Sequence, residues 1–84
     1  MDAGEALDAL GARLADGLQR RRTGGHGRML VVRSPESELD ATVTVSDGHY
    51  RVWIDGDAEP VAPVADPDLA ARRVAAIVAP AVTA

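Results

Sequence analysis

The side chains best suited to acid–base or nucleophilic chemistry are two histidines and three serines, and none has the spacing that such chemistry needs. His26 lies in a glycine-rich stretch, and His49 follows an Asp-Gly dipeptide. A catalytic histidine needs a carboxylate that holds it on a rigid element, and a nucleophile needs such a base beside it. We therefore expect exposed loop histidines, no catalytic residue and no enzymatic activity. The three serines are Ser34, Ser37 and Ser46.

A second candidate is the acidic stretch in which Asp55, Asp57 and Glu59 alternate with other residues. Carboxylates at alternate positions begin a calcium-binding loop, but such a loop continues with glycine at its sixth position and glutamate at its twelfth. Here Pro60 follows directly, and the twelfth position is Asp66. We expect a solvated acidic loop with no metal site and no cofactor.

The glycine-rich segment 23–27 could be taken for a phosphate-binding loop. Such loops run from a strand into the N-terminus of a helix, where backbone amides meet the phosphate. This segment is expected to follow a helix and precede a strand, which is the reverse order. We interpret it as a flexible connector.

The basic residues Arg20, Arg21 and Arg22, with Arg28 nearby, form the one basic cluster of the chain. Cations at the C-terminal end of a helix complement the helix dipole, and three adjacent helical residues point in different directions. Both facts favour a structural role. A nucleic-acid contact by these four residues remains the alternative.

The strongest candidate surface is a β-hairpin spanning residues 38–55. Apolar residues alternate with polar ones on both sides of Asp47-Gly48, a dipeptide typical of a type I′ turn. This turn predicts a register that pairs Ser46 with His49 and continues through Val43–Val52, Thr42–Trp53 and Ala41–Ile54. One face of the hairpin is then apolar, and the other carries Thr42, Thr44, Arg51 and Trp53.

The only tryptophan, Trp53, should therefore point away from the core. An exposed tryptophan on a sheet face often marks a contact surface, so these four residues are the predicted partner-binding set. In the alternative, the second helix or segment 58–65 folds over the indole and buries it.

Four further elements are expected around the hairpin. Asp2 and Glu5 resemble a capping box, and four leucines then recur at helical spacing, which predicts a helix from Ala3 to Arg21. Residues 28–33 predict a first strand that is short enough to lie at the edge of the sheet. Segment 58–65 contains two prolines and is an edge strand at best, or an extended arm. The expected helical leucines are Leu7, Leu10, Leu14 and Leu18.

The last element is a helix that opens at Asp66-Pro67-Asp68, where an N-cap, a proline and an acid stand in the order helices favour. Pro80 should end it. The predicted fold class is α+β: helix, three-stranded antiparallel sheet with a possible short fourth edge strand, helix, with both helices on one face and residues 1–84 forming a single domain. The expected buried stripe of the last helix is Ala70, Val74, Ile77, Val78 and Ala81.

Composition limits the core and the partners. The chain is 46% apolar, but alanine is common and Tyr50 and Trp53 are the only aromatics. No cysteine is present, so oligomerisation is the remaining way to stabilise so short a chain, and we expect a homodimer. The net charge of −4 disfavours general binding to nucleic acid or anionic membranes. With no apolar run of membrane-spanning length, a soluble cytoplasmic protein is expected.

The expected order of elements resembles the YbaB/EbfC family of small dimeric nucleoid-associated proteins. It is also similar to acidic α+β adaptor and secretion-chaperone-like domains, including YbjN-type proteins, which use the outer face of a small sheet to dimerise or to hold a partner. Residues 50–78, with Pro60-Val61, Pro63-Val64 and Arg72-Arg73, resemble small actinobacterial proteins to which no activity is attached. All nine basic residues are arginine, which fits a GC-rich genome.

Together these patterns predict a non-enzymatic interaction or adaptor module that binds itself, and a protein or peptide partner, through the sheet face around Trp53. The alternative is a YbaB-like nucleic-acid-associated dimer that uses Arg20, Arg21, Arg22 and Arg28.

Overall fold

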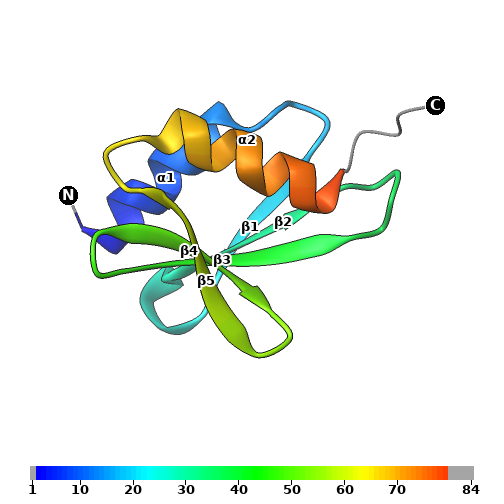
Figure 1. Ribbon diagram of the computed structural model, residues 1–84. Helices are drawn as coiled ribbons and strands as arrows, with labels where there is room; N and C mark the ends of the chain where they lie inside the picture. The colour runs from blue at the N-terminus through cyan, green and yellow to red at the C-terminus, as the bar shows by residue number, and fades with distance from the viewer. Residues whose placement is uncertain (1, 80–84) are drawn as a thin grey trace.

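The computed structural model describes residues 2–79, which form a five-stranded antiparallel sheet with two helices on one of its faces (Figure 1). The strands follow one another in chain order across the sheet, β1-β2-β3-β4-β5. The α+β class and the helix–sheet–helix order are as predicted, but the sheet has five strands rather than three. In chain order the elements are α1 (Ala3–Arg13), β1 (Gln19–Thr23), the short 3₁₀ helix η1 (Gly25–Gly27), β2 (Met29–Arg33), β3 (Asp40–Ser46), β4 (His49–Ile54), β5 (Asp57–Pro63) and α2 (Pro67–Val78).

Helix α1 begins as predicted and ends eight residues before the predicted Arg21. The Asp2 carboxylate accepts a hydrogen bond from the backbone N–H of Glu5 at 2.8 Å, so this N-cap satisfies one of the free amides of the first turn. The chain becomes extended at Leu14. Leu18 is still buried, from a loop, which explains why leucine spacing alone predicted a longer helix.

The arginine-rich segment is strand β1 and not the end of a helix. Its five residues pair with all of β2, from Gln19 with Arg33 to Thr23 with Met29. This pairing makes β2 an internal strand, although its length had indicated an edge. Segment 24–27 therefore joins two strands, with positive φ angles at Gly24, His26 and Gly27. Pairing with β2 has overridden the weak strand preference of arginine.

The β3–β4 hairpin is confirmed. Asp47 and Gly48 have φ angles of 52° and 73°, as a type I′ turn requires. The ladder runs from Ser46–His49 to Val43–Val52. Beyond Val52 strand β4 diverges from β3 (Figure 1), so the predicted pairs Thr42–Trp53 and Ala41–Ile54 are not part of the ladder.

Strand β5 is the edge strand that segment 58–65 predicted, and it pairs with β4 from His49–Pro63 to Ile54–Asp57, with an irregularity next to Arg51. A second Asp-Gly turn, at Asp55-Gly56, joins the two strands, with φ angles of 51° and 87°. Because β5 lies beside β4 in the sheet, it does not fold over Trp53.

Helix α2 has the predicted start. The Asp66 carboxylate accepts from the N–H of Leu69 at 3.1 Å, and Pro67 opens the helix. The helix ends at Val78; Pro80 and Ala81 lie outside the described residues. On its inner side Ala70, Val74 and Val78 are buried as predicted, while Ile77 is partly buried.

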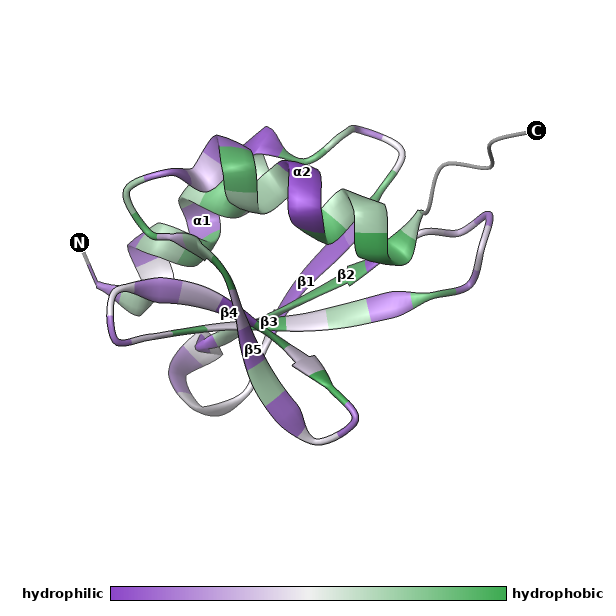
Figure 2. Cartoon of the chain, in the orientation of Figure 1, coloured by the Kyte–Doolittle hydropathy of each residue, from purple (hydrophilic) through white to green (hydrophobic). Residues whose placement is uncertain are grey.

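The core lies between the two helices and one face of the sheet. Figure 2 shows apolar residues alternating with polar ones along both helices. The sheet contributes Leu30, Val32, Val43, Tyr50 and Val52, each at most 2% exposed. Tyr50 is the only aromatic residue in this core.

Candidate interaction surface

The sheet face opposite the helices, called the outer face below, is not covered by any element within residues 2–79 (Figure 1). Strand alternation assigns its residues, because the neighbours of each buried core residue point the other way. The outer face comprises Gln19, Arg21 and Thr23 on β1, Met29, Val31 and Arg33 on β2, Asp40, Thr42, Thr44 and Ser46 on β3, His49, Arg51 and Trp53 on β4, and Ala58 and Pro60 on β5.

Trp53 points away from the core, as predicted, and is 47% exposed. Its indole Nε1 donates a hydrogen bond to the Thr44 hydroxyl at 3.2 Å. This bond joins β4 to β3 close to the point where the two strands diverge, and it fixes the orientation of the ring. Opposite Trp53 on β5 lies Ala58, whose small side chain leaves that side of the indole open.

Arg51 is more enclosed than Trp53, with 24% of its side chain exposed. Its Nη1 donates to the Ala58 carbonyl at 3.3 Å, and Nη2 lies 3.9 Å from the Asp47 carboxylate. The Nε atom is buried and has no hydrogen-bond partner among residues 2–79. Thr42 is half-buried on the same face. The four residues of the predicted set thus share one surface.

The basic cluster is divided by the strand that carries it. Arg20 and Arg22 face the helices, because they pair with the core residues Val32 and Leu30. Arg20 donates to the carbonyls of Gly11, Leu14, Ala15 and Leu18. It therefore satisfies acceptors that the end of α1 leaves without partners.

Arg22 is engaged in a similar way. Its guanidinium bonds to the Asp8 carboxylate and to the carbonyls of Gly4 and Gly27. The side chain thus ties β1 to α1 and to the β1–β2 connection. Arg28, the fourth member of the cluster, is exposed and forms no side-chain hydrogen bond or ion pair within residues 2–79.

Arg21 lies on the outer face, and so does Arg33, a residue that the sequence pattern had not singled out. An open hollow of about 410 Å³ lies there, lined by Gln19, Arg20, Arg21, Val31, Arg33 and Asp40. Arg21 pairs with Val31, and Arg33 is two residues further along β2. Diagonal neighbours of this kind are about 7–8 Å apart, and both arginines line this hollow. If β1 had been known to be a strand, the alternation of Arg33 with the buried Val32 could have indicated that Arg33 lies on the same face as Arg21.

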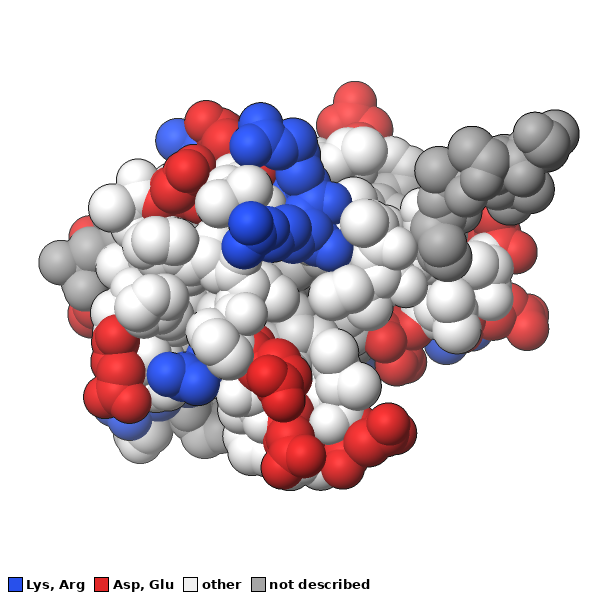
Figure 3. Space-filling view, in the orientation of Figure 1, with Lys and Arg blue, Asp and Glu red and all other residues white. Residues whose placement is uncertain are grey.

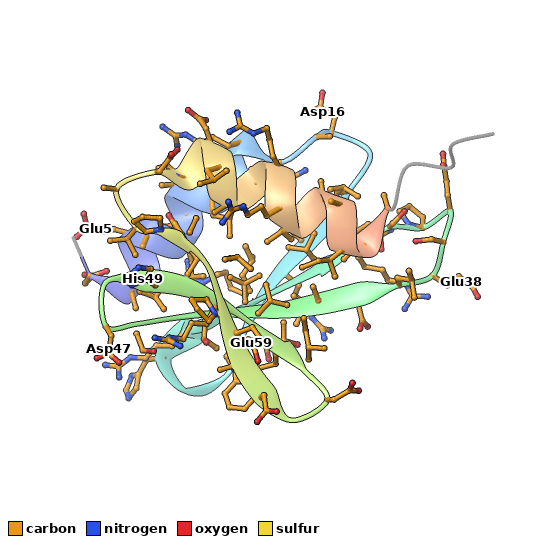
Figure 4. The ribbon with its side chains drawn as sticks, viewed as in Figure 1. Glu5, Asp16, Glu38, Asp47, His49 and Glu59 are labelled. Carbon is orange, nitrogen blue, oxygen red and sulfur yellow. The ribbon has the colours of Figure 1, made fainter. Side chains whose placement is uncertain are left out.

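His49 and the acidic stretch lie apart within residues 2–79. His49 lies at the β3–β4 turn beside Asp47, away from Glu59 on β5 (Figure 4), and its Nδ1 is 2.9 Å from the Asp47 backbone carbonyl. In the described part of the chain, no three His, Asp or Glu residues lie close enough together to hold a metal ion. The acidic residues instead surround the β4–β5 turn and are exposed.

One buried titratable group lies in the core. The Tyr50 hydroxyl donates to the Ala6 carbonyl at 2.6 Å. Burial raises the pKa of this hydroxyl, and the positive charge of Arg13 opposes part of that rise. The hydroxyl thus joins β4 to α1 inside the core.

No family model, curated protein or solved structure matches this chain. Function is therefore inferred from the geometry of the surface. No helix within residues 2–79 is long and apolar enough to cross a membrane.

Proposed function

We propose that the protein is a non-enzymatic, cytoplasmic interaction module that forms a homodimer through its outer face, with Trp53 in the contact. A single observation carries this proposal: both helices pack on one face of the sheet, while the opposite face presents an indole that is 47% exposed. Tryptophan is among the residues that contribute most when an interface buries them. The indole is also held in place before binding by its bond to Thr44.

The edges of the sheet support a face-to-face contact over an edge-to-edge one. Edge strand β5 contains Pro60 and Pro63, which cannot donate to a neighbouring strand. Edge strand β1 carries three consecutive arginines, and charged edges resist pairing with another chain. A second copy therefore meets fewer obstacles on the outer face than at either edge.

The size of the outer face sets the expected strength of the dimer. Five strands about 4.8 Å apart and about six residues long give a surface of roughly 20 × 20 Å, or about 400 Å² for each copy. Stable interfaces bury about 800 Å² for each partner. Side chains make the real surface larger than this flat area. We nevertheless expect a reversible dimer with a dissociation constant in the micromolar range.

The nucleic-acid alternative has less support in the contacts. Arg20 and Arg22 are engaged in bonds within the fold, which leaves Arg21 and Arg28 as the available members of its proposed set. A titration with duplex DNA at two salt concentrations separates the two proposals. Binding that weakens steeply with salt would favour the alternative.

Sedimentation equilibrium of the wild type and of Trp53→Ala tests the dimer. We expect a wild-type dimer with a blue-shifted indole emission and a folded, monomeric Trp53→Ala protein. Leu39→Ala is the matched control, because Leu39 is also 47% exposed but lies in the loop before β3. A wild type that stays monomeric at high concentration, with a fully quenchable indole, contradicts the proposal.

A further inference from the structure

The two edges of the sheet differ in their capacity to take up another strand. Strand β1 pairs with β2 over its full length without an irregularity, and no strand lies on its other side. At the opposite edge, β5 contains Pro60 and Pro63, and its pairing with β4 has an irregularity next to Arg51. A proline has no backbone N–H to donate. The β1 edge is therefore the one at which a further strand can pair without a break.

The side of β1 that faces away from β2, here called the free flank, has unpaired backbone groups. Within residues 2–79 the backbone of Gln19–Thr23 forms hydrogen bonds only in its ladder with β2. Gln19, Arg20 and Arg21 are exposed, so solvent reaches this flank. A row of unpaired N–H and C=O groups on an edge strand is a template for an incoming extended segment.

The two edges also carry opposite charges. Arg21 on β1 and its diagonal neighbour Arg33 on β2 lie on the outer face and form no ion pair within residues 2–79. On β5 and in the turn before it, Asp55, Asp57 and Glu59 are exposed, and Figure 3 shows acidic side chains gathered over this hairpin. An acidic segment is therefore attracted to the β1 edge and repelled by the β5 edge.

We propose that the free flank of β1 binds an extended acidic peptide segment of another protein, which adds to the sheet as an antiparallel strand and places a carboxylate opposite Arg21. Antiparallel pairing continues the pattern of the sheet and is slightly more stable per residue than parallel pairing. The inference does not rest on the proposed dimer, because that dimer uses the outer face and leaves this flank free.

The register of an added strand brings a carboxylate within reach of Arg21. Residues directly opposite each other in an antiparallel pair have Cβ atoms about 4.5–5.5 Å apart, and successive side chains alternate between the two faces. An acidic residue opposite Arg21 therefore projects on the outer face, beside the hollow that Arg21 and Arg33 line. Arg20 and Arg22 face the helices, where their guanidiniums are engaged within the fold. Acidic residues at alternate positions thus fit β1 better than a continuous acidic run.

The negative charge of the protein does not prevent this contact. The net charge of the chain is −4, but at physiological salt exposed charges interact over about 8 Å, so the nearest side chains dominate. Asp40 is the one acidic residue in the lining of the hollow, which also contains Arg20, Arg21 and Arg33. The local charge beside the free flank is therefore positive.

A second copy of this chain is a poor occupant of the same flank. A second β1 strand would bring Arg21 of one copy close to Arg21 of the other, and like charges directly opposite each other destabilise a strand pair. Strand β5 carries acidic residues, but its two prolines interrupt pairing. The arginines that protect this edge from a second copy therefore do not protect it from an acidic segment.

The probe is an end-capped heptapeptide in which threonine and glutamate alternate, since threonine favours strands and capping removes the terminal charges. Isothermal titration calorimetry at about 0.15 M salt should show saturable binding. The matched peptide with glutamine in place of glutamate should bind about fivefold more weakly. Two outcomes contradict the proposal: equal binding of both peptides, or no saturable binding up to about 1 mM peptide.

Hydrogen exchange of the β1 amides, followed by NMR, distinguishes strand addition from a charge contact alone. Only the free protein exposes the amides that point away from β2. The peptide at about ten times its dissociation constant should therefore slow their exchange about tenfold. Binding that leaves the exchange of these amides unchanged would mean that no strand is added, and the proposal would be wrong.

Variants locate the binding site. Arg21→Glu should weaken binding about fivefold or more, because a carboxylate then faces a carboxylate. Arg72→Glu is the control, since it makes the same change of charge at an exposed residue of α2, and it should bind like the wild type. Trp53→Ala should also bind like the wild type, because β2 and β3 separate β4 from β1.

The same variants separate this proposal from the proposed dimer. Equal weakening by Arg21→Glu and Arg72→Glu, or loss of peptide binding in Trp53→Ala, would place the peptide elsewhere on the molecule and overturn the β1 site. A wild type that binds the peptide at β1 but stays monomeric would overturn the dimer alone.

Discussion

The Tyr50 hydroxyl links the central part of the sheet to the first helix, since it donates to the Ala6 carbonyl from a fully buried position. Its ionisation is the one side-chain titration expected above pH 9, because the chain has one tyrosine, no cysteine, and only arginine among its basic residues apart from histidine. Alkaline stability therefore reports on this contact directly.

We expect the free energy of unfolding to fall as the pH rises past about 10. Burial raises the pKa of Tyr50 in the folded protein, so the unfolded chain ionises first. Each rise in pH between the pKa of the unfolded chain and the higher pKa of the folded protein then favours unfolding. Denaturant titrations between pH 8 and pH 11 measure the decline.

Tyr50→Phe is the matched control for this pH dependence. It should lower stability at pH 8 by about 1 kcal/mol through loss of the hydrogen bond, and its stability should then be constant between pH 9 and pH 11. An equally steep decline in the variant would show that another group is responsible.

Arg20 and Arg21 are adjacent but have different roles. Arg20 satisfies carbonyls at the end of α1, whereas Arg21 faces outward. We expect Arg20→Ala to lower the free energy of unfolding by about 1–2 kcal/mol, since charge-assisted hydrogen bonds are lost. Arg21→Ala should change it by less than about 0.5 kcal/mol. Chemical denaturation of both variants checks this, and equal losses would contradict the division of the cluster by strand alternation.

At the scale of elements, the sequence predicted the features that depend on residues close together in the chain. The Asp47-Gly48 turn, the N-caps at Asp2 and Asp66, and the buried face of α2 were all visible in the sequence, because each depends on residues a few positions apart. Strand β1 was missed because its stability comes from pairing with β2. The leucine spacing of α1 continued past its end because Leu18 reaches the same core from a loop.

The β4–β5 turn repeats the Asp-Gly signal of the first hairpin, although its charges had indicated only an acidic loop. Gly56 has a φ of 87°, and a Cβ atom added to it would meet no other residue. We expect Gly56→Ala to destabilise the protein by about 1 kcal/mol through backbone strain alone. Gly17→Ala is the control, because Gly17 also has open space but no positive φ; it should be neutral or slightly stabilising in thermal melts. Equal effects would show that turn strain is not the cause.

At the scale of the whole molecule, the sheet has one face packed and one face open. The sequence predicted the open face around Trp53, because alternation in one hairpin determines which residues point outward. It did not predict that Arg21 and Arg33 share this face, since the two become neighbours only when β1 pairs with β2. The part of the surface around Trp53 could therefore be predicted from one hairpin, whereas the part around Arg21 and Arg33 depended on the pairing of β1 with β2.

If only folded chains associate into the dimer, the stability of the fold depends on the protein concentration. Because association draws the equilibrium toward the folded state, stability grows with the ratio of protein concentration to dissociation constant, by about 2.7 kcal/mol at a hundredfold excess. We expect the melting temperature of the wild type to rise by several degrees between about 1 µM and about 100 µM protein. Trp53→Ala should melt at one temperature throughout, as measured by circular dichroism. A wild type whose melting temperature is equally independent of concentration would mean that the open face is not covered by a second copy.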